Sequence, residues 1–308
     1  MYYFCTYFDK NYLDKGLALY RSLVVHCSPF RLWVLCMDNE TYRILTDMKL
    51  SGVIPIRLQD FELGDTGLLE AKKNRSTIEY YFTCTPTLVL RILELNKEID
   101  VLTYLDADLY FFGSIEPAYR ELKHGSVLII EHRFPKALEY LEKYGIYNVG
   151  LLAIRNDKPG HTCLRWWRQN CLEWCYDRVE DGKFADQKYL DDWPVRFTGI
   201  IVLRNRSIGV APWNLAEYNG LPVIMFHFHG VKNIFSNLWD TDLIGYHALL
   251  TPNIKEQIYI PYIRELVRIR DELAVQYGWT APQSIRVSIR NPLSYLLKCR
   301  NDYILIFS

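Results

Sequence analysis

The 308-residue sequence lacks several features that mark common classes of protein. It has neither a GxxxxGKS nor a GxGxxG stretch, which argues against P-loop and dinucleotide-binding proteins. Lysine plus arginine equals aspartate plus glutamate, at 36 residues each, so no excess of positive charge indicates a nucleic-acid partner. We find no stretch that predicts a signal peptide or a transmembrane helix.

The cysteines also lack the spacing of a metal or disulfide framework, because no CxxC pair occurs among the eight. Cys163, Cys171 and Cys175 recur at helical spacing in a stretch rich in tryptophan. We therefore expect packed, reduced thiols rather than zinc ligands or disulfides. Reduced thiols fit a cytoplasmic protein, and this is the location that we predict.

The residues that are present support a large core, because half of them are apolar and 15% are aromatic. Strand-like runs such as MYYFCTYF, FRLWVLCMD and GVIPIRL alternate with segments of helical periodicity. This order predicts an α/β fold with a mostly parallel, Rossmann-like sheet and helices on both faces. We expect one main domain over residues 1–250 and a helical extension over 251–308 that packs on it.

Three local features predict helix boundaries. Thr85 and Pro86 are typical of an N-cap and a first helical residue. Residues 161–179 have the pattern of one long amphipathic helix. Residues 253–278 are mostly helical in pattern, and we expect Pro261 to break that helix.

Two aspartates follow the apolar run VLTYL, at positions 106 and 108. An Asp-x-Asp sequence also occurs by chance, and strand ends are polar in many proteins. On a strand, however, residues two apart point to the same face, so Asp106 and Asp108 would repel each other. A divalent cation between them removes that repulsion, and carboxylate oxygens suit Mg²⁺ or Mn²⁺. We therefore predict a metal site at the carboxyl end of this strand, where ligands of open α/β sheets bind.

The last 25 residues combine basic and aromatic side chains, and two interpretations stay open. The segment either contacts an anionic membrane surface peripherally or docks on the domain. The side chains concerned are Arg286, Arg290, Lys298, Arg300, Tyr295, Tyr303 and Phe307.

Further motifs follow the aspartate pair in a fixed order along the chain. They are Asn148–Gly150, then Asp186–Gln187 with Leu190, then His227–Phe228–x–Gly230 with Lys232 downstream. With the Asp-x-Asp pair and the opening strand and tyrosine-bearing helix, they make residues 1–240 resemble GT-A glycosyltransferases. The resemblance is to the retaining family 8, which includes glycogenin and the lipooligosaccharide galactosyltransferases. The sequence departs from that family after its histidine motif, where VKNIF replaces the usual Lys-Pro-Trp.

The resemblance implies a metal-dependent transferase of nucleotide sugars, divergent and similar to those of bacterial surface-polysaccharide clusters. Mn²⁺ or Mg²⁺ would be bound by Asp106, Asp108 and His227, with Asp106 also near the ribose. His229 competes with His227, and either histidine could instead be a core residue. Lys232 would hold a diphosphate oxygen.

The resemblance also assigns the donor contacts. Thr6, Tyr7 and Tyr12 resemble the nucleotide-binding segment, and Tyr12 either stacks on the base or is a core aromatic residue. Asn148 and Gln187 resemble contacts to the donor sugar. The donor would be a nucleoside diphosphate sugar, with UDP favoured by analogy.

Asp186 resembles the acidic residue near the anomeric carbon, and Gln187 accompanies it as a catalytic candidate. Family 8 implies retention of configuration, but the sequence leaves an inverting enzyme open, with Asp191 or Asp192 as base. Trp213 and Asn214 either line the acceptor side or pack structurally. The acceptor would be a glycan or a lipid-linked saccharide. The basic and aromatic C-terminal segment makes the inner face of the membrane a further predicted location.

Two other functions remain as alternatives. One is a non-catalytic scaffold with this fold that binds a glycan or a protein partner. The other is a sugar-phosphate nucleotidyltransferase, which normally has a glycine-rich basic loop near its N-terminus. The sequence CTYFDKNYLDKG does not supply that loop.

Overall fold

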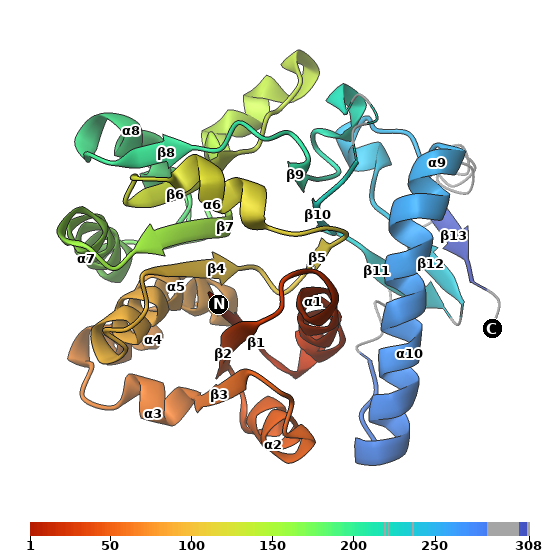
Figure 1. The fold of residues 1–308 in the computed structure, drawn as a ribbon, viewed down its shortest axis with the longest axis horizontal. Helices are drawn as coiled ribbons and strands as arrows, with labels where there is room; N and C mark the ends of the chain where they lie inside the picture. The colour runs from red at the N-terminus through yellow and green to blue at the C-terminus, as the bar shows by residue number, and fades with distance from the viewer. Residues whose placement is uncertain (219, 221, 236, 282–301, 307–308) are drawn as a thin grey trace.

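A seven-stranded sheet forms the centre of the protein, in a computed structural model that describes residues 1–281, except 219, 221 and 236, and residues 302–306. Its strands, in spatial order, are β3 (Val53–Arg57), β2 (Phe30–Cys36), β1 (Tyr2–Phe8), β4 (Val101–Leu105), β7 (Tyr147–Arg155), β6 (Val127–Glu131) and β8 (Ile200–Val202) (Figure 1).

The sheet is mostly parallel, as predicted. Strands β3, β2, β1 and β4 run parallel, and β8 is parallel to β6. Only β7 runs antiparallel to its neighbours, β4 and β6. The carboxyl ends of β1 and β4 therefore meet at the same edge as the start of β7.

Both faces of the sheet are buried. Successive apolar side chains of β2 point to opposite faces, so each face has its own hydrophobic cluster. Leu32 and Val34 belong to one buried cluster, whereas Trp33 and Leu35 belong to the other. The first cluster includes residues of α1 (Leu13–His26), α2 (Asn39–Met48), α6 (Glu116–Leu122) and α10 (Ile260–Tyr277). The second includes residues of α3 (Leu58–Glu62), α4 (Thr66–Asn74), α5 (Thr77–Leu95), α7 (Lys158–Glu173) and α8 (Trp193–Arg196).

Two small sheets complete the strands of the described chain. The first orders β5 (Leu109–Phe111), β10 (Met225–His227) and β9 (Ile208–Val210). The second orders β11 (Lys232–Phe235), β12 (Leu238–Asp240) and β13 (Tyr303–Leu305). Short 3₁₀ segments lie between the larger elements, at Lys10–Tyr12, Lys136–Tyr144, Lys188–Asp192, Leu215–Glu217 and Ile244–Tyr246.

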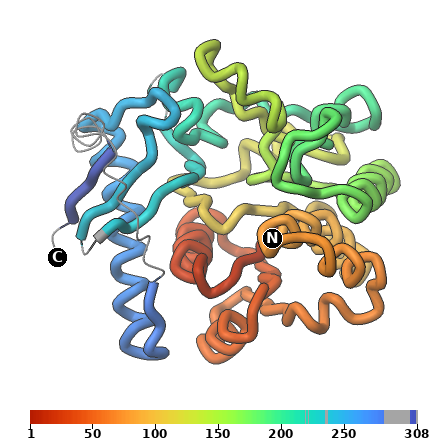
Figure 2. Tube along the Cα trace, turned by 180° about the vertical axis from the view of Figure 1, so that it is seen from behind, coloured from red at the N-terminus to blue at the C-terminus, as the bar shows by residue number. Residues whose placement is uncertain are grey.

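The helix α10 packs beside α1, and Figure 2 shows the two helices from behind, α10 in blue and α1 in red. A buried ion pair joins the two helices, because Arg270 Nε lies 2.7 Å from Asp14 Oδ2. Arg21 makes a second link at 2.8 Å to Glu265. These contacts attach the predicted extension to the main body, although the domain boundary at residue 250 stays a prediction.

The predicted start of a helix at Thr85 and Pro86 is wrong, because both residues lie inside α5. Ser76 caps this helix instead, and its side chain accepts a hydrogen bond from the backbone N–H of Glu79. The Glu79 carboxylate accepts one from the backbone N–H of Ser76, which completes a capping box. This reciprocal pair outweighs the Thr-Pro signal, and Pro86 occupies a buried interior position of the helix.

Two other helix predictions need correction. The helix α7 ends at Glu173, and Trp174 is extended, so residues 174–179 are not helical. Aromatic contacts replace the helix there: the rings of Trp174 and Tyr176 lie 5.4 Å apart. Pro261 does not break a helix but lies in the first turn of α10, directly after a π-helical turn and the short α9 (Pro252–Ile254).

The prediction of reduced thiols is confirmed for the described residues, where Cys163, Cys171 and Cys175 are buried and free. In the described part of the chain, no helix is long and apolar enough to cross a bilayer. The proposed membrane contact falls mainly on residues 282–301, which lie outside the described residues. Tyr303 is described and lies in β13, and Phe307 lies outside.

Candidate functional site

A cavity of about 1080 Å³ lies beyond the carboxyl ends of β1 and β4, where the sequence predicts the site. This volume is at the upper end of the range for small-molecule sites. Aromatic rings form much of its wall, and polar side chains gather at one part of it. The aromatic residues are Tyr7, Phe8, Tyr12, Tyr81, Phe82, Tyr104, Phe134, Tyr144, Phe184, Trp213 and Tyr246.

The structure brings Asp106, Asp108 and His227 together on this wall. Asp106 directly follows β4, and Asp108 directly precedes β5. Strand β10 pairs antiparallel with β5, so that His227 lies opposite Leu109. The backbone N–H of Phe228 donates to the carbonyl of Asp108 at 2.9 Å. As a result, His227 Nε2 lies 3.1 Å from Asp108 Oδ1 and 3.8 Å from Asp106 Oδ2.

The two carboxylates have different electrostatic environments. Burial raises the pKa of Asp106, and the charge of His227 only partly offsets it. Burial acts on Asp108 in the same direction, but the charge and hydrogen bond of His227 hold the pKa of Asp108 well below its usual range. The Asp108 carboxylate raises the pKa of His227 in spite of burial. The two carboxylates therefore favour positive charge at this position, which a bound cation would also supply.

His229 lies beside Asp108 and His227. Its position follows from Phe228, the residue between the two histidines, which points into the core. Phe228 is fully buried and stacks on Tyr262 at 3.7 Å, so His227 and His229 both face the cavity. The possible ligand atoms of Asp108, His227 and His229 all lie within 4.8 Å of one another. His227 and His229 are therefore not alternatives, because the ring nitrogens of both lie close enough to Asp108 to contact one ion.

Asn148 is held by a chain of hydrogen bonds that the sequence analysis did not predict. Its Oδ1 accepts from the backbone N–H of Gly150 at 2.7 Å, so its Nδ2 is the atom 3.2 Å from His132 Nε2. His132 Nδ1 lies 3.2 Å from the carbonyl of Ile146. This carbonyl can only accept, so Nδ1 carries the proton and Nε2 accepts from Asn148. Burial lowers the pKa of His132 to about 3, which keeps the ring neutral.

Gly150 has a steric role in this arrangement. A side chain at Gly150 would place a Cβ 2.4 Å from Asn148 Oδ1 and 3.0 Å from the His227 ring. Only glycine therefore allows Asn148 and His227 to pack against the start of β7.

Asp186 and Gln187 lie in the irregular segment after α7, where Gln187 lines the cavity and Asp186 is buried and does not line it. Trp167 of α7 holds Asp186 in place, because its indole N–H donates to the Asp186 carbonyl at 2.8 Å. Burial raises the pKa of the Asp186 carboxyl to about 7, with a hydrogen bond to Thr85 opposing this and the charge of Asp106 adding to it. Gln187 lines the cavity and donates to the Tyr144 carbonyl at 3.1 Å.

The nucleotide-binding candidates lie in different surroundings. Tyr7 and Tyr12 line the cavity, and Tyr12 is 43% exposed, so its alternative role as a core residue is wrong. Thr6 is fully buried and does not line the cavity. Lys232 lies on β11 outside the cavity lining, with Nζ 3.9 Å from Asp240. A different cation, Lys15, lies over the Tyr12 ring at 4.1 Å, and its charge lowers the pKa of Asp108.

Of the remaining predicted site residues, Trp213 lines the cavity, and Asn214, Asp191 and Asp192 do not. Trp213 lines the cavity, and its ring centroid is 5.2 Å from His227 and 5.7 Å from His229. Asn214 is buried and donates to two backbone carbonyls, which is a structural use. Asp191 accepts from the backbone N–H of Ile146 and pairs with Lys188, and Asp192 pairs with Arg196.

Sequence reasoning missed His132, Tyr104 and Lys15. His132 is the first residue after β6, so it carries the same strand-end signal as Asp106. Tyr104 donates from its hydroxyl to Asp106 Oδ1 at 2.8 Å and so orients that carboxylate. The sequence does not reveal this role, because Tyr104 lies within the apolar run of β4 and looks like any other buried strand residue.

Comparison with known proteins gives two groups of relatives. No protein-family profile matches the sequence. The uncharacterised protein YfnD of Bacillus subtilis is 28% identical over 286 residues, which cover 88% of this chain and 91% of the relative. The uncharacterised protein YfnF of the same organism is 30% identical over 255 residues, which cover 76% of this chain and 83% of the relative.

Solved structures of glycosyltransferases share the fold. Galactosyltransferase LgtC, in complex with donor and acceptor sugar analogues, has a TM-score of 0.54 at 16% identity, covering 86% of this chain and 95% of LgtC. Mouse xyloside xylosyltransferase 1 has a TM-score of 0.51 at 12% identity, covering 74% of this chain and 98% of that enzyme. At these identities the likeness shows a common fold, the GT-A fold, which confirms the predicted fold class.

Proposed function

Because the chain belongs to the same family as Bacillus subtilis YfnF and has the GT-A fold, we propose that it is a metal-dependent glycosyltransferase. In this proposal it transfers a sugar from a nucleoside diphosphate sugar to a saccharide acceptor. The donor is a UDP-sugar, and the acceptor is a glycan or lipid-linked saccharide of a surface polysaccharide. LgtC, which was solved with donor and acceptor sugar analogues, supports this pair of substrate classes.

The observation that carries the proposal is the convergence of Asp106, Asp108 and His227 on the wall of the large cavity. Two carboxylates from the connection between β4 and β5 and an imidazole from β10 form a donor set that fits Mn²⁺ or Mg²⁺. The like charges of the aspartates need such a partner. When bound there, a divalent ion supplies positive charge that stabilises the departing nucleoside diphosphate.

The other residues of the wall would bind and orient the donor. Tyr7 and Tyr12 offer rings beside the aspartate pair for the base and ribose. Thr6 is buried in β1 and would support this segment from within the sheet. Asn148 and Gln187 present amide groups to the sugar hydroxyls. Lys15, whose ammonium group lies over the ring of Tyr12, would place positive charge against the diphosphate. Lys232 would have to reach in from outside the cavity lining to do the same.

Asp186 is our candidate for the group that acts at the anomeric carbon. Its burial disfavours the charged form, so a developing positive charge on the sugar is the partner that would stabilise its carboxylate. In a retaining mechanism Asp186 either stabilises that charge or attacks as a transient nucleophile. Gln187, its neighbour, would hold the sugar in position for either path.

The experiment is donor cleavage measured on a panel of nucleotide sugars with Mn²⁺, with Mg²⁺ and after chelation with EDTA. We expect slow release of the nucleoside diphosphate from one donor, loss of that release on chelation, and faster release when a sugar acceptor is added. The Asp108→Asn variant should release none, whereas the control Asp60→Asn, a matched change at an exposed position of α3, should match the wild type.

Binding of a nucleotide sugar without any cleavage or transfer would favour the non-catalytic scaffold. Release that continues unchanged in EDTA and in Asp108→Asn would contradict the role proposed for the aspartate pair.

A further inference from the structure

We propose that His229 is a fourth protein ligand of the metal, so that the centre selects first-row transition ions such as Co²⁺ and Mn²⁺ over Mg²⁺. The inference rests on the proposed function for the presence of a metal at this wall of the cavity. It goes further by assigning both histidines, together with Asp106 and Asp108, to one ion. It also predicts which ions the protein prefers.

The geometry of the segment after β10 supports two imidazole ligands. The possible ligand atoms of His229, His227 and Asp108 lie within 4.8 Å of one another, which is a spread that one ion can bridge after small rotamer changes. Asp106 Oδ2 lies 3.8 Å from Nε2 of His227, the same nitrogen that Asp108 Oδ1 approaches at 3.1 Å. The hydroxyl of Tyr104 orients that carboxylate.

The surroundings of His229 fix its backbone but leave its ring accessible. Gly230 follows it with a φ of +80°, and a side chain there would meet Asp242 at 2.9 Å. The chain therefore turns directly after His229, and only glycine allows this turn. The His229 ring packs beside Trp213 and Tyr246, is exposed to solvent and lines the cavity.

The donor set decides the preference among ions. Mg²⁺ prefers oxygen ligands and retains several waters, so an added imidazole contributes little to its binding. Imidazole suits the later first-row ions, whose affinities rise from Mn²⁺ through Co²⁺. A set with two nitrogens and two carboxylates should therefore bind Co²⁺ and Mn²⁺ more tightly than Mg²⁺, and His229 should account for much of the difference.

The test is calorimetric titration of the full-length, metal-free protein with CoCl₂, MnCl₂ and MgCl₂, without any nucleotide. We expect His229→Asn to weaken Co²⁺ binding at least about tenfold and to change Mg²⁺ binding less than about twofold. The visible absorption of bound Co²⁺ should change in the same variant, because one nitrogen ligand is lost. The control His124→Asn, at an exposed position before β6, should behave as the wild type.

The inference is overturned if His229→Asn binds Co²⁺ as tightly as the wild type, or if it loses Mg²⁺ affinity to the same extent. It is also overturned if the wild-type protein binds none of these ions. Its failure is separable from that of the proposed function. Metal-dependent cleavage of a donor with no effect of His229→Asn on metal binding refutes only the inference. A His229-dependent Co²⁺ site without cleavage or transfer of any nucleotide sugar refutes only the transferase.

Discussion

His132 shows how one buried side chain determines the position of another. Its Nε2 accepts from Asn148, while the Asn148 oxygen accepts from Gly150, so the amide has a single orientation. Asn148 lines the cavity, and its Nδ2 carries a second hydrogen that a ligand there could accept. This makes His132 a positioning residue that acts through Asn148, and its neutral ring is required for the acceptor role.

We predict that His132→Phe lowers kcat/KM for donor cleavage about tenfold, which corresponds to the loss of one hydrogen bond of ~1.4 kcal/mol. The phenyl ring keeps the stacking on Phe134 but cannot accept from Asn148. His132→Gln restores an acceptor and should recover part of the loss. Equal kinetics of the two variants, at equal stability in urea, would contradict the positioning role.

Asp186 predicts a pH dependence of stability in the metal-free protein. The pKa of its carboxyl is raised to about 7 in the folded state, above its value in the unfolded chain. Between pH 4 and 7 the folded state therefore binds more protons, so stability falls as pH rises through this range and the penalty is complete above it.

We expect Asp186→Asn to remove this decline and to be more stable than the wild type at pH 8 by on the order of 3 kcal/mol. At pH 4 the two proteins should differ much less. Urea unfolding at both pH values measures this, and parallel pH profiles would show that Asp186 does not titrate as we expect.

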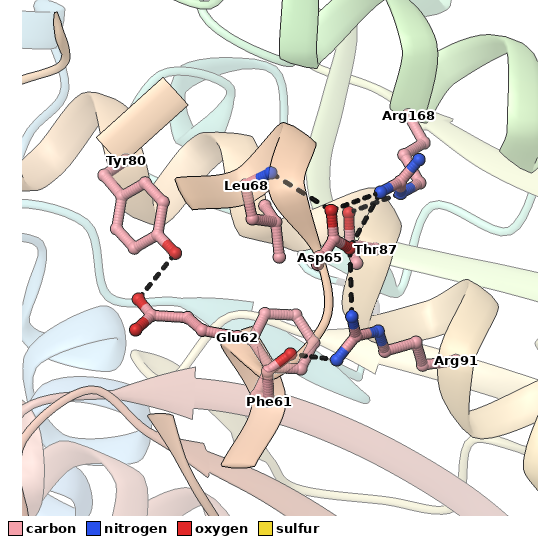
Figure 3. Close-up of polar contacts among 8 residues, drawn as sticks. All are labelled: Phe61, Glu62, Asp65, Leu68, Tyr80, Thr87, Arg91 and Arg168. Atoms are coloured by element: carbon pink, nitrogen blue, oxygen red, sulfur yellow. Dashed lines mark hydrogen bonds and ion pairs between the residues drawn. The ribbon is translucent and has the colours of Figure 1, made fainter. Parts of the chain in front are cut away.

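At the scale of elements, helices α4, α5 and α7 are joined by one buried carboxylate (Figure 3). Asp65 caps α4, accepting from the backbone N–H of Leu68 at 3.1 Å. Both oxygens of Asp65 also lie 2.8 Å from Arg168 Nη2 of α7, and one lies 3.0 Å from Arg91 Nη2 of α5. Burial raises the pKa of Asp65, but these donors outweigh it and lower the pKa.

We predict that Asp65→Ala destabilises the fold by about 2–3 kcal/mol, because it removes a helix cap and leaves two guanidinium groups without their counter-charge. Glu70→Ala, which removes an exposed ion pair on the same helix, should cost less than about 0.5 kcal/mol. Equal midpoints and slopes in urea unfolding of the two variants would refute a central role for Asp65.

Elements also show what the sequence could predict. Strands β1, β2 and β4 were predictable because each is a continuous apolar run, and Asp106 and Asp108 were predictable because they end one. The start of α5 was mispredicted because Thr85 and Pro86 resemble a helix start, although Ser76 and Glu79 had already formed one. The end of α7 depends on packing of Trp174 and Tyr176, which helical periodicity does not reveal.

At the scale of the whole molecule, the site depends on contacts between distant segments. The order of the motifs along the chain predicted their membership of one site, but not their distances. The hydrogen bond between Phe228 and Asp108 and the antiparallel pairing of β10 with β5 bring His227 to the aspartates. Neither leaves a local signal in the sequence, and the same is true of the His132–Asn148 contact.

Different helices cover the two faces of the central sheet. Helices α1 and α10 stabilise one face through Asp14 and Arg270, and α5 and α7 stabilise the other. The cavity lies beyond the carboxyl ends of β1 and β4, and residues from the first and last thirds of the chain share its wall.

The most direct test of this account is the anomalous scattering of Mn²⁺ in crystals of the protein grown with MnCl₂ and UDP. We predict one strong peak about 2.2 Å from a carboxylate oxygen of Asp108 and from Nε2 of His227, with the diphosphate on its open side. A peak elsewhere in the cavity, or UDP bound there with no peak at the aspartate pair, would contradict it.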